Sequence, residues 1–145
     1  MRWIACLCLV LLAACSDPRP PVGKWEGGYE RDGTLVVARV EIMPSGQVRI
    51  SAPDLLNIQD TRPEQMARHR ARLVAELVNN WADVAPRPFD FDGKIFRKPD
   101  GVAPQMVWDA KSNHMTLQLY FGNNPALPVV LRPVVDFNDS PFGAG

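Results

Sequence analysis

The sequence feature that most constrains the fold is an alternation of apolar and polar side chains with a period of two residues. It is clearest between residues 34 and 43, where four successive even positions are apolar: Val36, Ala38, Val40 and Ile42. Successive side chains of a β-strand point to opposite faces. We therefore expect these four side chains to face a core, and Arg39 and Glu41 to face water.

Comparable short segments recur along the chain and are separated by turn sequences. We expect strands near residues 24–30, 34–43, 47–52, 89–95, 106–110, 115–121 and 127–133. In the fourth segment, Phe89, Phe91 and Ile95 should share one face. Turns are predicted where Gly, Pro, Asn and Asp gather: at Pro44–Gly46, Lys98–Gly101, Asp109–Asn113 and Gly122–Pro125. Short turns join antiparallel neighbours, so the chain should form an antiparallel meander or curved sheet of about seven strands.

One helix interrupts the strands after the third of them, which makes the expected class β-rich α+β. Apolar residues recur there with helical spacing: Met66, Leu73, Val74, Leu77, Trp81 and Val84. Thr61 and Glu64 have the spacing of a capping box, and Pro86 and Pro88 should end the helix. We predict one amphipathic helix over about residues 62–84.

Size and charge favour a single neutral domain. The chain has 145 residues, 14 Pro, 10 Gly and a formal net charge of zero. Frequent turn residues suit a β-rich fold, and a mixed surface argues against a nucleic-acid partner. We expect one domain over residues 23–135, followed by a flexible polar tail over 136–145.

The N-terminal residues have the pattern of an export signal. Arg2 precedes a continuous apolar run from Ile4 to Leu12, which is too short to span a bilayer. The sequence Leu12-Ala13-Ala14-Cys15 resembles the lipobox of bacterial lipoproteins. The resemblance implies removal of residues 1–14 as a signal peptide and attachment of acyl chains, such as palmitate, at Cys15. An ordinary secretory signal, or a short apolar helix with an incidental Cys, is the alternative.

The same resemblance gives the expected location and partner. The lipid on Cys15 would anchor the chain to a membrane of the bacterial envelope, facing the periplasm, and Ser16 favours the outer membrane over the inner one. Residues 15–22 contain Pro18, Pro20 and Pro21 and should form an extended tether. The other two cysteines, Cys6 and Cys8, lie in the segment to be removed, so no Cys remains for a disulfide or a metal.

The first expected strand opens with Gly23-x-Trp25-x-Gly27. These five residues resemble the Gly-x-Trp start of lipocalin-like barrels, in which the Trp closes one end. The resemblance implies a partial barrel with an interior that can hold a ligand. The simpler interpretation is a core Trp at the start of a strand.

Arg70 is the most unusual residue of the predicted helix, because it falls within the apolar arc near Trp81. A buried charge requires a partner. Together with Trp25, these residues form a hypothetical site for a ligand carboxylate in a half-open barrel. The alternatives are that Arg70 reaches out to water or pairs with a structural carboxylate.

No pattern indicates catalysis, and we expect neither a cofactor nor a metal. His69 and His114 are the two histidines and are far apart in the sequence, and the Asp90-x-Asp92 pair is only weakly typical of calcium sites. We therefore predict a non-enzymatic protein that binds an apolar ligand or lipid. The alternative is a protein-interaction module, an assembly accessory or hydrolase inhibitor, that presents apolar side chains from Pro53–Ile58 or Gly122–Pro128.

Overall fold

The computed structural model describes residues 19–137, 141 and 142, and within this part it contains one helix and a ten-stranded antiparallel sheet. The predicted signal peptide and Cys15 lie outside the described residues. In chain order the elements are β1 (Gly23–Arg31), β2 (Thr34–Ile42), β3 (Gln47–Ser51), β4 (Leu56–Asn57), α1 (Pro63–Trp81), β5 (Arg87–Pro88), β6 (Asp90–Phe91), β7 (Ile95–Arg97), β8 (Gln105–Asp109), β9 (His114–Leu119) and β10 (Leu127–Val134).

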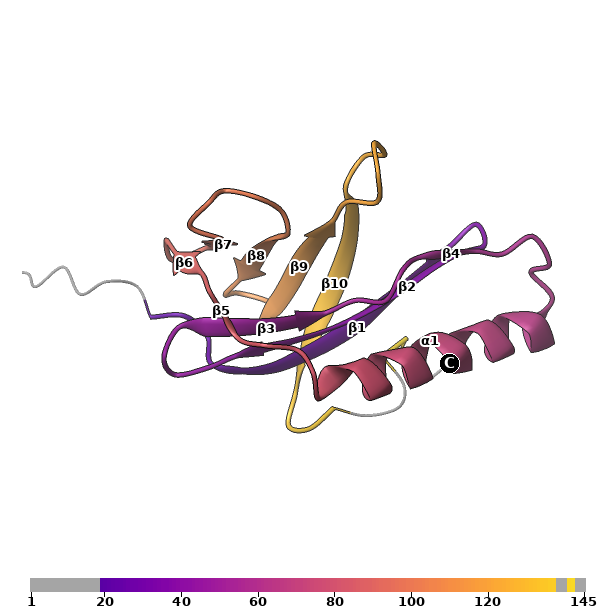
Figure 1. The fold of residues 1–145 in the computed structure, drawn as a ribbon, viewed down its shortest axis with the longest axis horizontal. Helices are drawn as coiled ribbons and strands as arrows, with labels where there is room; N and C mark the ends of the chain where they lie inside the picture. The colour runs from indigo at the N-terminus through magenta and orange to yellow at the C-terminus, as the bar shows by residue number, and fades with distance from the viewer. Residues whose placement is uncertain (1–18, 138–140, 143–145) are drawn as a thin grey trace, which may run out of the picture.

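The sheet curves into a nearly closed, barrel-like structure (Figure 1). Its strand order is β5-β3-β2-β1-β10-β9-β8-β7-β6, and β4 pairs separately with β2. The outermost members, β5 and β6, are separated in the chain by Phe89 alone, so the chain itself links the two edges. The β-rich antiparallel fold predicted from the sequence is confirmed, although the strands number ten and not seven.

The three additional strands contain only two residues each, which is too short for a periodic signal. The division of residues 89–95 into β6 and β7 also corrects the predicted inner face. Phe91 pairs with Phe96 across a turn, and their ring centroids are 4.4 Å apart. Phe96, and not Ile95, is fully buried, because a turn within the segment changes which alternate positions face inward.

Strand β10 joins the two parts of the sheet. Its first five residues, Leu127–Leu131, pair with β9, and Arg132, Pro133 and Val134 pair with β1. Gly27 of β1 permits this change of partner, because a Cβ at this position would run into the carbonyl oxygen of Val130. A glycine within a strand commonly marks such a close backbone approach.

Strand β2 has a core on each side. Its even positions face the larger core inside the curved sheet, as predicted, together with Trp25, Phe96 and Leu117. Leu35 and Val37 point the other way, toward α1. The expectation that Arg39 faces water was wrong: its residue exposure is 4 %. Alternation identifies the two faces of a strand, but it does not reveal that a second layer covers the polar one.

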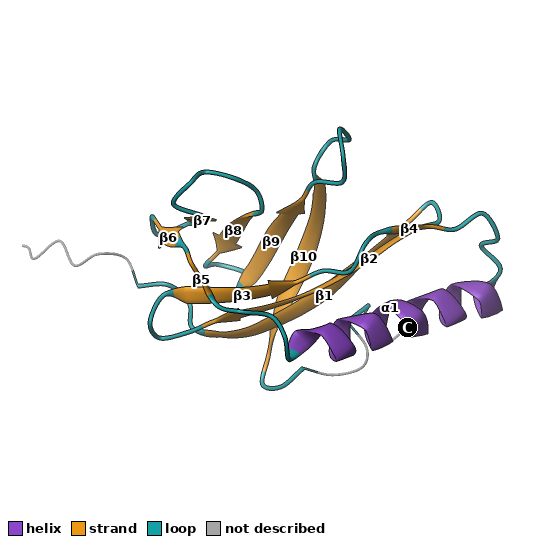
Figure 2. Cartoon of the chain, viewed as in Figure 1, coloured by secondary structure: helices purple, strands orange, loops and turns teal. Residues whose placement is uncertain are grey.

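Helix α1 provides that second layer and lies along the outer face of the sheet (Figure 2). Met66, Leu73 and Leu77 form its buried face and pack on β2. The helix begins at Pro63, with Arg62 as the N-cap residue and no side-chain cap. The predicted Thr61 capping box is therefore wrong. Asp60 instead accepts a hydrogen bond from the N–H of Arg62 at 3.2 Å, and Pro63 supplies the fixed φ that suits a first helical turn.

Candidate ligand-binding site

The three residues of the hypothetical site lie on two different faces of the sheet. Trp25 points into the larger core and is 3 % exposed, and its Nε1 has no hydrogen-bond partner among the described residues. Arg70 and Trp81 belong to α1, on the opposite face. They are separated by three helical turns, about 16 Å along the axis. The structure thus does not bring the three side chains to one place.

Arg70 pairs with a carboxylate of the protein. Its Nη1 donates to Oε1 and Oε2 of Glu30, at 2.8 and 2.9 Å, where β1 passes beside the helix. About a third of each side chain remains exposed. Among the three interpretations of Arg70 given by the sequence, the structure agrees with pairing to a structural carboxylate. The contact also connects the helix to β1 of the sheet.

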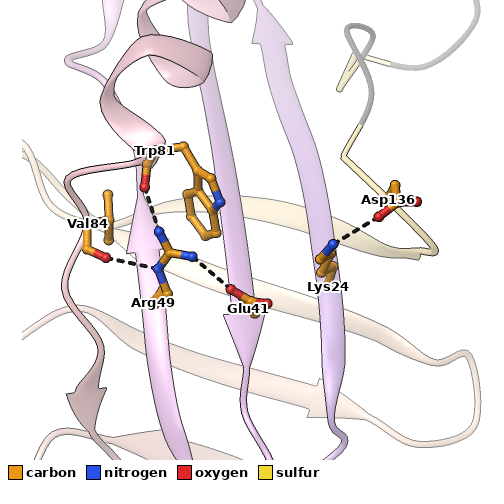
Figure 3. A network of polar contacts seen from close by, with 6 residues as sticks. All are labelled: Lys24, Glu41, Arg49, Trp81, Val84 and Asp136. Atoms are coloured by element: carbon orange, nitrogen blue, oxygen red, sulfur yellow. Dashed lines mark hydrogen bonds and ion pairs between the residues drawn. The ribbon is translucent and has the colours of Figure 1, made fainter.

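Trp81 takes part in a polar network at the C-terminal end of α1 (Figure 3). Arg49 of β3 donates to the carbonyl oxygens of Trp81 and Val84, at 2.6 and 2.9 Å, and to Oε2 of Glu41, at 3.0 Å. Its guanidinium also lies 4.3 Å from the centroid of the Trp81 ring. The last turn of the helix has no basic residue of its own. Arg49 therefore supplies the positive charge that favours a helix C-terminus.

The described residues after β10 pack against the same face. Asp136 accepts a hydrogen bond from Lys24 Nζ at 2.9 Å. The Phe137 ring meets Trp81 edge-on, with centroids 4.8 Å apart, and lies 4.8 Å from the guanidinium of Arg39. Phe142 packs on the core beneath α1. Where the sequence predicts a flexible tail, these residues contact the domain, because their aromatic rings cover part of the outer face.

A pocket of about 730 Å³ lies where the margin of the larger core opens between β3 and the connection that follows β7. Three segments and the end of β9 line it: Val48, Ile50, Ala52; Val84, Ala85, Arg87, Pro88, Phe89; Lys98, Pro99, Asp100, Pro104; and Leu119. Four of the lining residues pack against the larger core, to which the buried residues Phe96 and Leu117 belong. The pocket is therefore a hollow at the edge of a packed core, and its volume falls in the range of about 300–1,000 Å³ typical of small-molecule sites.

The wall and the rim of this pocket differ in chemistry. Ile50, Phe89 and Leu119 are partly buried against the larger core and give the wall its apolar character. The charged residues Arg87, Lys98 and Asp100 also line the pocket. An apolar wall with a few polar groups suits reversible binding of an apolar or amphiphilic molecule.

This pocket was not predictable from the sequence, because its residues come from segments far apart in the chain. Of the apolar lining residues, the sequence pattern singled out Phe89, as part of the apolar face of a predicted strand. The local signals that could have drawn attention to the rest are the lining prolines at positions 88, 99 and 104, which interrupt regular strands.

The apolar side chains of the two loops considered for a protein partner are partly buried and contact the domain. Leu55 packs on the larger core, and Leu56 and Ile58 pack on the core beneath α1. In the second loop Leu127 is turned toward the larger core, and residues 122–125 form an exposed polar turn. The loops therefore contribute to folding contacts.

Asp92 holds the turn between β6 and β7. Its Oδ1 accepts hydrogen bonds from the N–H groups of Ile95 and Lys94, at 2.7 and 2.9 Å, and its Oδ2 lies 3.1 Å from Arg97 Nη1. The bonds from Ile95 and Lys94 hold the pKa of Asp92 below its ordinary value, and Arg97 lowers this pKa further. The carboxylate has a structural use in the turn, independent of any ion.

This arrangement makes stability depend on pH. Because the folded-state pKa of Asp92 is depressed, its stabilisation is present above the unfolded-state pKa of about 3.9 and is lost as the pH falls through the folded-state value. We predict that Asp92→Asn is less stable than the parent at neutral pH, and that the difference shrinks as the pH falls below the unfolded-state pKa of Asp. Urea unfolding across this range measures it, with Asp90→Asn as the neighbouring control. A difference that does not change with pH contradicts the prediction.

Two further observations concern the described residues only. No group of three His, Cys, Asp or Glu side chains there is arranged to hold a metal ion. His69 lies on α1 and His114 begins β9. Within the same residues, no helix has both the length and the apolar character required to cross a membrane.

No family model, no curated protein and no solved structure matches this chain. A proposal for its function must therefore be argued from its own residues.

Proposed function

We propose that this chain is a lipid-anchored lipoprotein of the bacterial envelope whose β-rich domain binds an apolar ligand or lipid without catalysing a reaction. The observation that carries the binding role is the pocket of about 730 Å³ with apolar side chains from β3, Phe89 and β9. Transfer of apolar surface from water into such a pocket contributes roughly 25 cal/mol per Å². The lipobox sequence ending at Cys15 supports the anchor.

The anchor and the pocket suit one another. Two or more acyl chains on Cys15 give stable membrane attachment, because each buried CH₂ contributes about 0.8 kcal/mol. In this proposal residues 1–14 are removed, and the Pro-containing tether before β1 holds the domain near the periplasmic face of the outer membrane. A domain held there meets apolar molecules at the high local concentration of a bilayer.

The binding role is tested by photolabelling of the lipidated protein in its own membranes. The probe is dodecanol with a photoreactive diazirine, and labelled peptides are identified by mass spectrometry. We expect the pocket peptides containing Ile50 and Leu119 to be labelled more than the peptide containing Val130, which is 49 % exposed on β10. Leu119→Trp fills the pocket and should abolish the excess labelling, whereas Val130→Trp should retain it. Equal labelling of all these peptides overturns the binding role.

The anchor is tested separately by mass spectrometry of protein isolated from bacterial membranes. We expect a chain that begins at a diacylglyceryl-modified Cys15, and a Cys15→Ala variant that loses this modification and its membrane attachment. Cys8→Ala, within the segment to be removed, is the matched control and should be processed normally. An intact Met1 start or an unmodified Cys15 sulfur contradicts the proposal.

A further inference from the structure

We infer that the ligand of the pocket is a fatty acid, with its single hydrocarbon chain against the apolar wall and its carboxylate between Arg87 and Lys98. This inference rests on the proposed binding function and names the ligand class for the same pocket. It is carried by the charges that line the pocket together with the apolar wall.

Arg87 and Lys98 are two cations available to a ligand. Arg87, in the short strand β5, forms no ion pair or hydrogen bond with a side chain among the described residues. Lys98 Nζ makes only a long contact of 3.5 Å with the carbonyl oxygen of Ala103 in that part of the chain. Arg49, Arg70 and Arg97 each have a carboxylate partner. Lys94 and Arg132 have no side-chain partner among the described residues either, so what distinguishes Arg87 and Lys98 is that they line the pocket. A cation without a protein partner at the rim of an apolar pocket complements an anionic head group.

Asp100 determines how much negative charge the rim accommodates. Its Oδ1 accepts a hydrogen bond from the N–H of Val102 at 2.9 Å, so its carboxylate is held within the turn. The positive charges of Arg87 and Lys98 and the negative charge of Asp100 together give the rim one positive charge in excess. A fatty acid carries one negative charge and neutralises that excess. A dianionic phosphate head group would exceed it, and a quaternary ammonium would be repelled by it.

The apolar wall is where the hydrocarbon chain of the ligand would lie. Ile50, Ala52, Phe89 and Leu119 line the pocket and are packed against the larger core. The tail therefore lies along the margin of the core and not through the centre of the barrel-like sheet.

The test compares three photoreactive twelve-carbon probes on the lipidated protein in membranes: dodecanoate, dodecanol and dodecyl phosphate. Labelling of the Ile50 and Leu119 peptides is divided by labelling of the Val130 peptide, which corrects for partitioning into the bilayer. We expect this ratio to be about fivefold higher for dodecanoate than for either of the others, the size of an ion pair at a partly exposed site. The double variant Arg87→Gln/Lys98→Met should reduce the ratio for dodecanoate to that for dodecanol.

The possible outcomes separate the two proposals. If the labelling ratio of pocket peptides to the Val130 peptide is above one and equal for dodecanoate and dodecanol, the fatty-acid assignment is wrong. The proposed binding of an apolar ligand is then still supported. A higher ratio for dodecyl phosphate overturns the argument from rim charge. If no probe labels the pocket peptides above the Val130 peptide, the binding function itself fails. Lys94→Met, an exposed cation that does not line the pocket, serves as the charge-matched control and should leave every ratio unchanged.

Discussion

Replacing Glu26 with Gln should lower the free energy of unfolding by about 3–4 kcal/mol, because it leaves the charge of Arg39 buried without its carboxylate. Glu26 Oε2 lies 3.4 Å from Arg39 Nε, and the two side chains are 3 % and 5 % exposed. They face each other between β1 and β2 on the side that α1 and Phe137 cover. Removal of one partner from a buried pair costs much more than removal of the pair.

The double variant Glu26→Gln/Arg39→Met distinguishes this account from a simple loss of packing. Met keeps an apolar stem beside the Phe137 ring and removes the charge, so the double variant should recover most of the stability lost by Glu26→Gln. Glu41→Gln provides the matched control: its partner Arg49 is 18 % exposed, and the loss should stay near 1 kcal/mol. Urea unfolding at neutral pH gives all three values. Additive losses in the double variant contradict the buried-charge account.

The strands and turns that were predictable from the sequence are those whose signal lies within a few neighbouring residues. The alternation in β2 identifies its inner face, and turn residues place the hairpins around Pro44 and Gly101. The β6–β7 hairpin was not predictable, because its strands are too short to show a period. The buried position of Arg39 depends on where α1 lies, which no local pattern encodes.

The candidate site was less predictable than the fold for the same physical reason. Arg70 and Trp81 stood out in the helical pattern as candidate ligand-binding residues. In the structure Arg70 pairs with Glu30, and Trp81 accepts a hydrogen bond from Arg49. Both partners are distant in the sequence, so the pattern of the helix could not reveal them. The pocket residues are individually ordinary and become a site only when β3, Phe89 and the turn after β7 meet. A binding surface built from separate segments leaves no motif in any of them.

The two cores on either side of β2 should unfold together, and Leu77→Ala should reveal this. Leu77 is fully buried beneath α1, so its truncation should cost about 2–5 kcal/mol. Val78→Ala, next to it on the exposed side of α1, should change stability by less than about 0.5 kcal/mol. Circular dichroism measures the loss of helix during urea unfolding, and tryptophan fluorescence reports on the inner core in a Trp81→Phe background, which removes the tryptophan of α1.

The two probes should report one transition, because β2 contributes alternate side chains to both cores. Leu35 and Val37 contact the core beneath α1, and Val36 and Val40 contact the core that contains Trp25. If Leu77→Ala detaches the helix, the outer face of β2 becomes exposed and the inner core loses its support. The midpoints by helix signal and by tryptophan signal should therefore shift together. A helix transition that precedes the fluorescence transition would show that α1 is a separable layer, and the shared role of β2 would be wrong.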